Sequence, residues 1–166
     1  PVRTGERLPA VLPAAGYVVT KAAVLPVLNT GSASDDDANR IGSSLETYFI
    51  RQGNRIFEFV DRVAVEENLK EQNFSRTDFV DDESSKQRLG ALLRAEYLVI
   101  ARLTQSGTRS VTHTLNVRIV PVESNVVKAI ATIEAASVSD LVRQLPGTVD
   151  DLLRQVLENE GYPAVN

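Results

Sequence analysis

Residues 111–121 read VTHTLNVRIVP, and apolar and polar side chains alternate along this stretch. The odd positions carry valine, leucine, isoleucine and one histidine, whereas the even positions from Thr112 to Arg118 are polar. A period of two is that of an extended strand, whose successive side chains point to opposite faces of a sheet. The stretch therefore predicts a strand with one face against a core and one polar face.

Two neighbouring runs extend this strand into a meander. Residues 97–103 (YLVIARL) precede a turn at 105–107, and residues 126–135 (VVKAIATIEA) follow a short connection at 123–125. A parallel return would need a crossover of a dozen residues or more, so connections this short predict antiparallel pairing of all three strands.

Upstream segments supply further strands. Residues 18–28 are rich in valine, alanine and leucine and end at a turn cluster, which is typical of a buried central strand. Residues 55–60 (RIFEFV) predict a second, short strand. Apolar residues at steps of three and four predict amphipathic helices at 35–52, 62–72, 83–94 and 138–160.

The sequence also predicts the helix caps and the buried stripe of the third helix. Ser34 or Asp35 caps the first helix and Gly53 closes it in the left-handed conformation, while Asp61 caps the second. In the third helix the buried stripe consists of Leu89, Leu92 and Leu93, and Gly90 costs about 1 kcal/mol relative to alanine.

The last helix contains Pro146 and Gly147, which we expect to interrupt or kink it, so that Thr148 caps the continuation. Together these segments predict one α/β (α+β) domain at 21–166. Its architecture is a mixed sheet of about five strands with a C-terminal antiparallel meander, flanked by about four helices. Residues 1–20 hold three prolines and two glycines, so we expect an extended N-terminal arm or tether there.

Composition narrows the classes of function. The formal net charge of -4 argues against a protein that neutralises nucleic-acid phosphates, and the absence of cysteine removes disulfides, thiol nucleophiles and cysteine metal sites. No stretch approaches the ~18 consecutive apolar residues that span a bilayer, so we expect any membrane attachment, such as a lipid anchor, to lie upstream. With no methionine, Pro1 follows either a removed export signal or an artificial boundary.

The residues that could carry chemistry are few. His113 is the only histidine, and its place in the apolar series of the alternating strand favours a packed, hydrogen-bonded side chain over a catalytic one. The acids at 35–37 suit a helix start better than a calcium loop, because they lack the alternate ligand spacing. We therefore expect no enzyme activity, no catalytic residue, no cofactor and no metal.

Five stretches, in this order, resemble one family. They are KAAVLPVLNTGS at 21–32, the helix at 35–52, FEFVDRVAVEENLKEQNF at 57–74, LGALLRAEYLVIARL at 89–103 and LNVRIVPVESNVVKA at 115–129. Each alone is common, but in register they resemble the CsgG/TolB-N-terminal/LpoB-like superfamily of bacterial envelope accessory proteins.

This resemblance implies a periplasmic protein, often a lipoprotein held at the outer membrane, that works by binding other proteins. Its first implication is a structural component of a secretion or flagellar outer-membrane apparatus, assembled as a ring or other oligomer. The alternative is a monomeric regulatory lipoprotein domain that binds and activates a peptidoglycan synthase. In either case the connections between the predicted strands are too short for the membrane-crossing hairpins of a pore.

A candidate binding surface follows from the alternating strand. If one sheet face is uncovered, Thr112, Thr114, Asn116 and Arg118 would line it and meet a protein partner. The alternative is that this row is merely solvated. No nucleic-acid partner is expected.

Overall fold

The computed structural model describes residues 20–71, 83–124 and 126–160, so the expected arm lies almost wholly outside the described residues. The elements, in chain order, are β1 (Thr20–Val24), β2 (Leu28–Asn29), α1 (Asp35–Gly53), β3 (Phe57–Phe59), α2 (Arg62–Glu71), α4 (Glu83–Leu93), β4 (Tyr97–Ser106), β5 (Thr112–Pro121), β6 (Ala129–Ala135) and α5 (Val138–Asn159).

The strands form one mixed, six-stranded sheet in the order β3-β1-β4-β5-β6, with β2 paired to β4 beyond the end of β1. The β1 strand is parallel to both β3 and β4, whereas β4, β5 and β6 are antiparallel. The predicted meander and the predicted α/β class are therefore confirmed. The expected strand at 18–28 is divided in two at Pro26, which has no backbone N–H to donate to a neighbouring strand.

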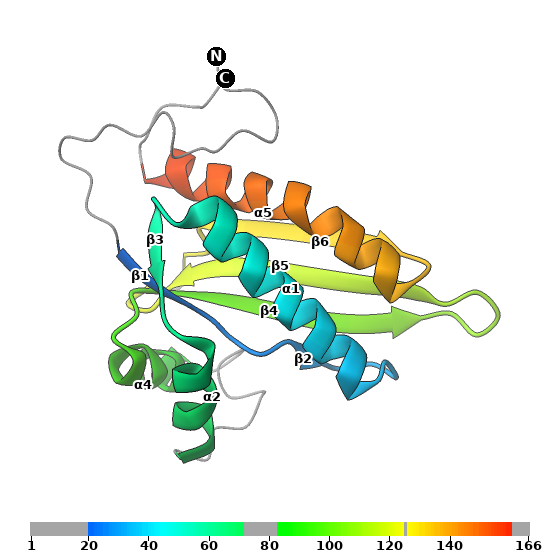
Figure 1. The fold of residues 1–166 in the computed structure, drawn as a ribbon, viewed down its shortest axis with the longest axis horizontal. Helices are drawn as coiled ribbons and strands as arrows, with labels where there is room; N and C mark the ends of the chain where they lie inside the picture. Colours follow the sequence, from blue (N-terminus) through cyan, green and yellow to red (C-terminus); the bar gives the residue numbers. More distant parts are fainter. Residues whose placement is uncertain (1–19, 72–82, 125, 161–166) are drawn as a thin grey trace.

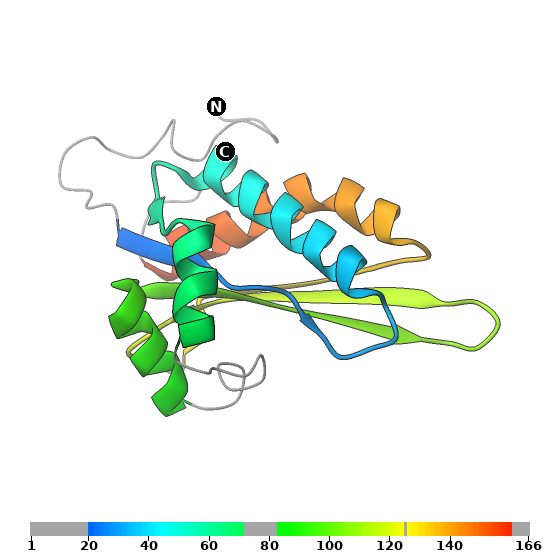
Figure 2. The same ribbon diagram turned by 60° about the horizontal axis from the view of Figure 1, so that its bottom comes forward.

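Helices cover the two faces of the sheet unequally (Figures 1 and 2). On one face α1 and α5 pack side by side over the sheet, except for the projecting β4–β5 hairpin (Figure 1), and enclose the larger core, which includes Phe49, Leu103, Val117 and Leu153. On the other face α2 and α4 cover only one end of the sheet, over a smaller core that includes Leu98 and other buried apolar side chains.

Local signals place most helix starts correctly. The Ser34 hydroxyl accepts a hydrogen bond from the Asp37 amide at 3.1 Å, and Asp61 Oδ1 accepts one from the Val63 amide at 2.7 Å. The left-handed closure at Gly53 is wrong, because α1 ends through Asn54 at φ −67. Gly53 instead lies against α5, where an added Cβ would be 3.1 Å from Leu153 Cδ2.

The prediction for Pro146 is also wrong, since α5 runs without interruption from Val138 to Asn159. Thr148 caps nothing; its hydroxyl donates to the Gln144 carbonyl at 2.7 Å. Leu145 and Val149, on either side of the proline, are both fully buried in the same core. This burial offsets the ~3 kcal/mol that an interior proline costs a helix.

In α4 the expected stripe is correct for Leu89 and Leu93, but Leu92 is 39% exposed. Gly90 has a packing role that its helix propensity does not reveal. An added Cβ would lie 3.0 Å from Val122 Cβ and closer still to both Val122 γ-carbons. The glycine therefore lets α4 approach the end of β5 at close range. Within the described residues, no helix combines the length and apolar character that crossing a bilayer requires.

Candidate functional site

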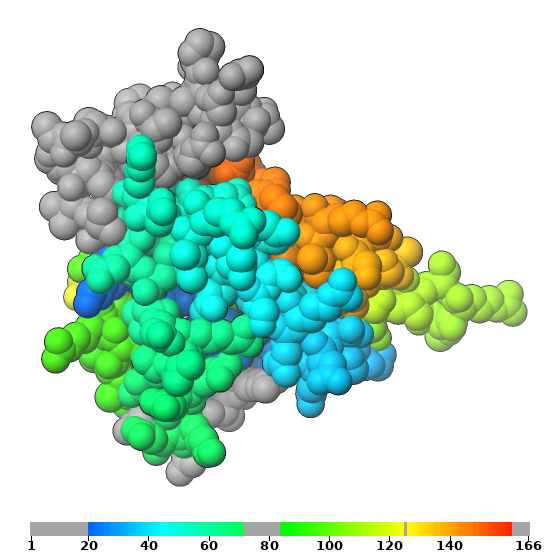
Figure 3. Space-filling view, viewed as in Figure 1, coloured from blue at the N-terminus to red at the C-terminus, as the bar shows by residue number. Residues whose placement is uncertain are grey.

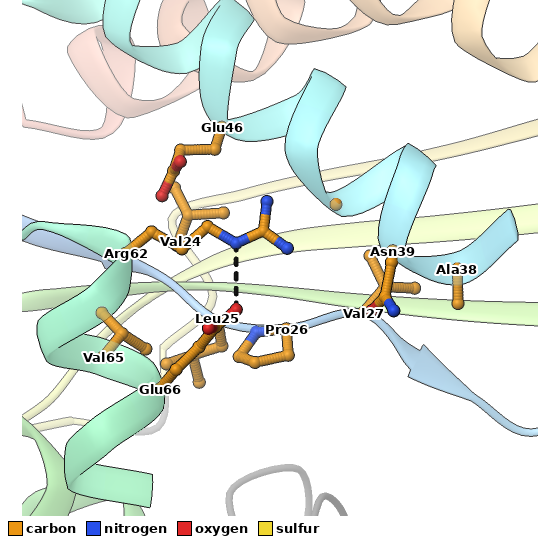
Figure 4. A pocket seen from close by; sticks show the side chains of 11 residues that line it. Val24, Leu25, Pro26, Val27, Ala38, Asn39, Glu46, Arg62, Val65 and Glu66 are labelled. Atoms are coloured by element: carbon orange, nitrogen blue, oxygen red, sulfur yellow. Dashed lines mark hydrogen bonds and ion pairs between the residues drawn. The ribbon is translucent and has the colours of Figure 1, made fainter. Parts of the chain in front are cut away.

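A small enclosed hollow lies between α1, α2 and the link from β1 to β2 (Figure 4). Its volume is about 10 Å³, which is room for about one water molecule. Arg62 Nε contacts Glu66 Oε1, one turn further along α2, at 3.1 Å (Figure 4). Burial raises the pKa of the neighbouring Glu46 carboxyl, an effect that Arg62 partly opposes. This is a packed helix junction, and it is too small to hold a substrate.

His113 lies on the helix-covered side of β5, near the β4–β5 turn. Gln105 Nε2 donates to His113 Nδ1 at 3.0 Å, and the Ser32 hydroxyl donates to the side-chain oxygen Oε1 of Gln105. The imidazole is therefore a half-buried, hydrogen-bonded side chain, as its position in the strand predicts. No group of three or more metal-ligating side chains occurs among the described residues.

The best candidate is the part of the sheet that α2 and α4 leave bare (Figure 2). We call it the open face. It is formed by even-numbered side chains of the meander, because the odd-numbered ones enter the core beneath α1 and α5. Its members are Arg102, Thr104, Thr112, Thr114, Asn116, Arg118, Ile130, Thr132 and Glu134.

Strand register places these residues in rows across three strands. Arg102 on β4 is opposite Asn116 on β5, which in turn is opposite Thr132 on β6. Asn116 Nδ2 donates to Thr132 Oγ1 at 2.9 Å, so both side chains lie on the same face. The next row toward the helices pairs Arg118 with Ile130, whose side chain is 50% exposed.

The four residues that the sequence singled out, Thr112, Thr114, Asn116 and Arg118, all belong to the open face. That they bind a partner stays a prediction. Sequence reasoning missed Arg102 and Ile130, which reach this surface from the two neighbouring strands. A signal was present, because each continues the even-numbered positions of its own strand, but only the register shows which residue lies beside which.

The open face ends at the β6 edge, which α5 covers with amide side chains. Gln155 accepts from the Ile130 amide at 2.9 Å and donates to the Ile130 carbonyl at 3.0 Å. Gln144 donates to the Glu134 carbonyl at 3.1 Å and Asn159 to the Lys128 carbonyl at 2.8 Å. These bonds occupy backbone N–H and C=O groups to which an additional strand would otherwise form hydrogen bonds, so β6 is protected against strand addition.

Along the strand direction, the open face continues onto the β4–β5 hairpin, which projects beyond the helices (Figure 3). Gly107 at its turn has φ +96, a conformation that favours glycine, and Thr108, Arg109 and Ser110 are exposed. The accessible surface therefore continues from the sheet onto a protruding tip.

No protein-family model matches the sequence, and no curated protein matches it significantly. Solved structures do share the fold. Lipoprotein GNA1162 from Neisseria meningitidis is 15% identical with a TM-score of 0.57, and the match covers 76% of this chain and 96% of that one. The LpoB C-terminal domain from Salmonella enterica is 14% identical with a TM-score of 0.51, covering 80% of this chain and 94% of that one.

At these identities the likeness shows the fold alone. The chain therefore has an LpoB-like fold, found also in lipoprotein GNA1162, which agrees with that part of the family resemblance. The CsgG and TolB parts of the resemblance stay predictions.

Proposed function

We propose that this chain is a non-enzymatic regulatory domain of the bacterial envelope that binds a peptidoglycan synthase and activates it. The observation that carries the proposal is the open face, a sheet surface that no described element covers, on a fold shared with LpoB. Lipoproteins on the same fold support an envelope location.

The chemistry of the described residues favours binding over catalysis. The one histidine is hydrogen-bonded to Gln105 on the covered side of the sheet. The open face, by contrast, combines two arginines, an exposed isoleucine and hydroxyl or amide side chains. Arginine beside apolar surface is frequent where protein interfaces hold most of their binding energy.

The regulatory function is favoured over ring assembly by the β6 edge. A ring built by continuing the sheet from subunit to subunit needs two different free edges, one on each side of the subunit. Gln144, Gln155 and Asn159 occupy the backbone groups of one of them. This does not bear on rings built through helices or loops, so the oligomeric state is part of the test.

The test combines the full chain with a purified bifunctional peptidoglycan synthase of the source bacterium. We expect saturable stimulation of glycan polymerisation and a sedimentation coefficient of the free chain that does not change with concentration. A chain that forms a large closed ring and leaves the synthase rate unchanged would overturn the proposal in favour of a structural component.

A further inference from the structure

We infer that the open face recognises an acidic, partly apolar segment of its protein partner, whose carboxylates pair with Arg102 and Arg118 while an apolar side chain covers Ile130. This inference rests on the proposed function and names the chemistry of the partner that the same surface would take.

The first step is the position of the two arginines. Arg102 is opposite Asn116, and Arg118, two residues further along β5, is opposite Ile100. The arginines are therefore diagonal neighbours on adjacent strands and on the same face, a separation of roughly 7–8 Å that long side chains bridge easily. Their guanidinium groups would reach carboxylates on one short segment together.

The second step is the absence of a partner for either guanidinium group in the part of the chain that the structure describes. Some other cations have an acidic partner nearby, as in Arg143 with Asp140 at 3.0 Å and Lys128 with Glu160 at 3.4 Å. Among the described residues, neither Arg102 nor Arg118 has an ion pair or a side-chain hydrogen bond. Two arginines that have no ion pair within residues 20–71, 83–124 and 126–160, on one face of a chain with net charge -4, suit the binding of carboxylates.

The acid on the open face does not neutralise them. Glu134 is opposite Thr114, two rows away from Arg118 and toward the hairpin end of the sheet. The face is thus divided into a basic part near the helices and an acidic residue near the tip. A partner whose acidic groups lie over Arg102 and Arg118 would satisfy the basic part.

The third step is the apolar surface beside the arginines. Ile130 is 50% exposed and is opposite Arg118 in the strand register. A carboxylate-bearing peptide with an apolar side chain would cover both features at once. A nucleic acid has no apolar side chain, and the net negative charge of this chain would repel it.

The experiment follows backbone amide resonances of the full chain during titration with two probes. One is a short capped peptide rich in glutamate and leucine, and the other has lysine in place of each glutamate. We expect the first probe to shift Arg102, Arg118 and Ile130, and the second to leave them unchanged. Sodium sulfate at equal charge controls for general anion capture.

Variants then identify the contacts. R102Q/R118Q should weaken binding of the acidic peptide by about tenfold or more, because the charge-assisted hydrogen bonds from both guanidinium groups are lost. R102K/R118K should retain part of the affinity because it keeps the charge. R143Q, on the exposed side of α5, is the matched control and should bind as the unmodified chain does.

The outcomes distinguish failure of the inference from failure of the proposed function. Peptide binding that R102Q/R118Q leaves unchanged, no binding of the acidic peptide, or equal shifts with the lysine peptide or with sulfate would overturn the inference. If the acidic peptide binds as expected but the synthase is not stimulated, the proposed function fails and the inference stands. If R102Q/R118Q stimulates the synthase as well as the unmodified chain does, the inference fails and the function stands.

Discussion

Gln155 of α5 binds both backbone groups of Ile130 on β6, accepting from its N–H at 2.9 Å and donating to its carbonyl at 3.0 Å. One side chain thereby takes the place of the two hydrogen bonds that an additional strand would make to this residue. The arrangement links the last helix to the last strand and closes the edge that borders the open face.

Replacement of Gln155 by alanine should release the Ile130 amide. Because Gln155 is its hydrogen-bond acceptor, we expect faster amide hydrogen exchange at Ile130 in Q155A and little change at Ile133, which is paired with Leu115 of β5, measured residue by residue by NMR. E158A, on the exposed side of the same helix, is the control. Unchanged exchange at Ile130 would show that the bond does not protect the edge in solution.

The combined variant Q144A/Q155A/N159A should associate with itself. Removing all three amides exposes backbone groups along β6, and free strand edges pair with other chains. Light scattering coupled to size exclusion should show a rising mass with concentration, whereas the unmodified chain keeps a constant mass. Circular dichroism checks that the variant is folded, and a folded variant of constant mass would contradict the protective role.

Gly90→Ala should destabilise the fold although alanine is the better helix former. The added methyl group would meet the Val122 side chain at less than van der Waals distance, and overpacking of this kind costs about 1–3 kcal/mol. Gly147→Ala is the matched change in α5, where nothing lies within 4 Å, and it should stabilise by roughly 0.5–1 kcal/mol. Urea denaturation of both variants measures the contrast; equal effects would refute it.

Glu46→Gln should stabilise the protein at neutral pH. Burial raises the pKa of Glu46 above 4.5 in the folded state, with Arg62 acting in the opposite direction. Because the folded pKa is the higher one, the associated stability is present below about pH 4.5 and is lost as pH rises through the folded value. The advantage of E46Q should therefore shrink on acidification, with E158Q as control. A difference that does not change with pH would contradict this assignment.

His113→Gln should leave partner binding intact, because His113 lies on the side of β5 opposite the open face. Loss of the bond from Gln105 should cost about 0.5–1.5 kcal/mol of stability. Thermal melting and the synthase assay measure the two effects. If H113Q folds normally but loses the cellular activity, a catalytic role for the imidazole would have to be considered again.

The sequence by itself determined the elements. Alternation at 111–121 and 126–135, short connections and helical periodicity predicted the strands of the meander and the four described helices. Local signals also predicted the cap at Asp61 and offered Ser34 as one of two candidates for the cap of α1. These signals are local, because each depends on residues within a few positions of one another. The row from Thr112 to Arg118 was predictable for the same reason.

Only the tertiary structure decided which of these residues become neighbours. Because α5 packs against α1, it stays helical at Pro146. Strand register placed Arg102 and Ile130 beside Arg118. The bonds from Gln155 to Ile130 join residues 25 positions apart, and no local pattern encodes them. The physical reason is that burial and register depend on free energies summed over distant segments, and these can exceed the local preference of any one residue.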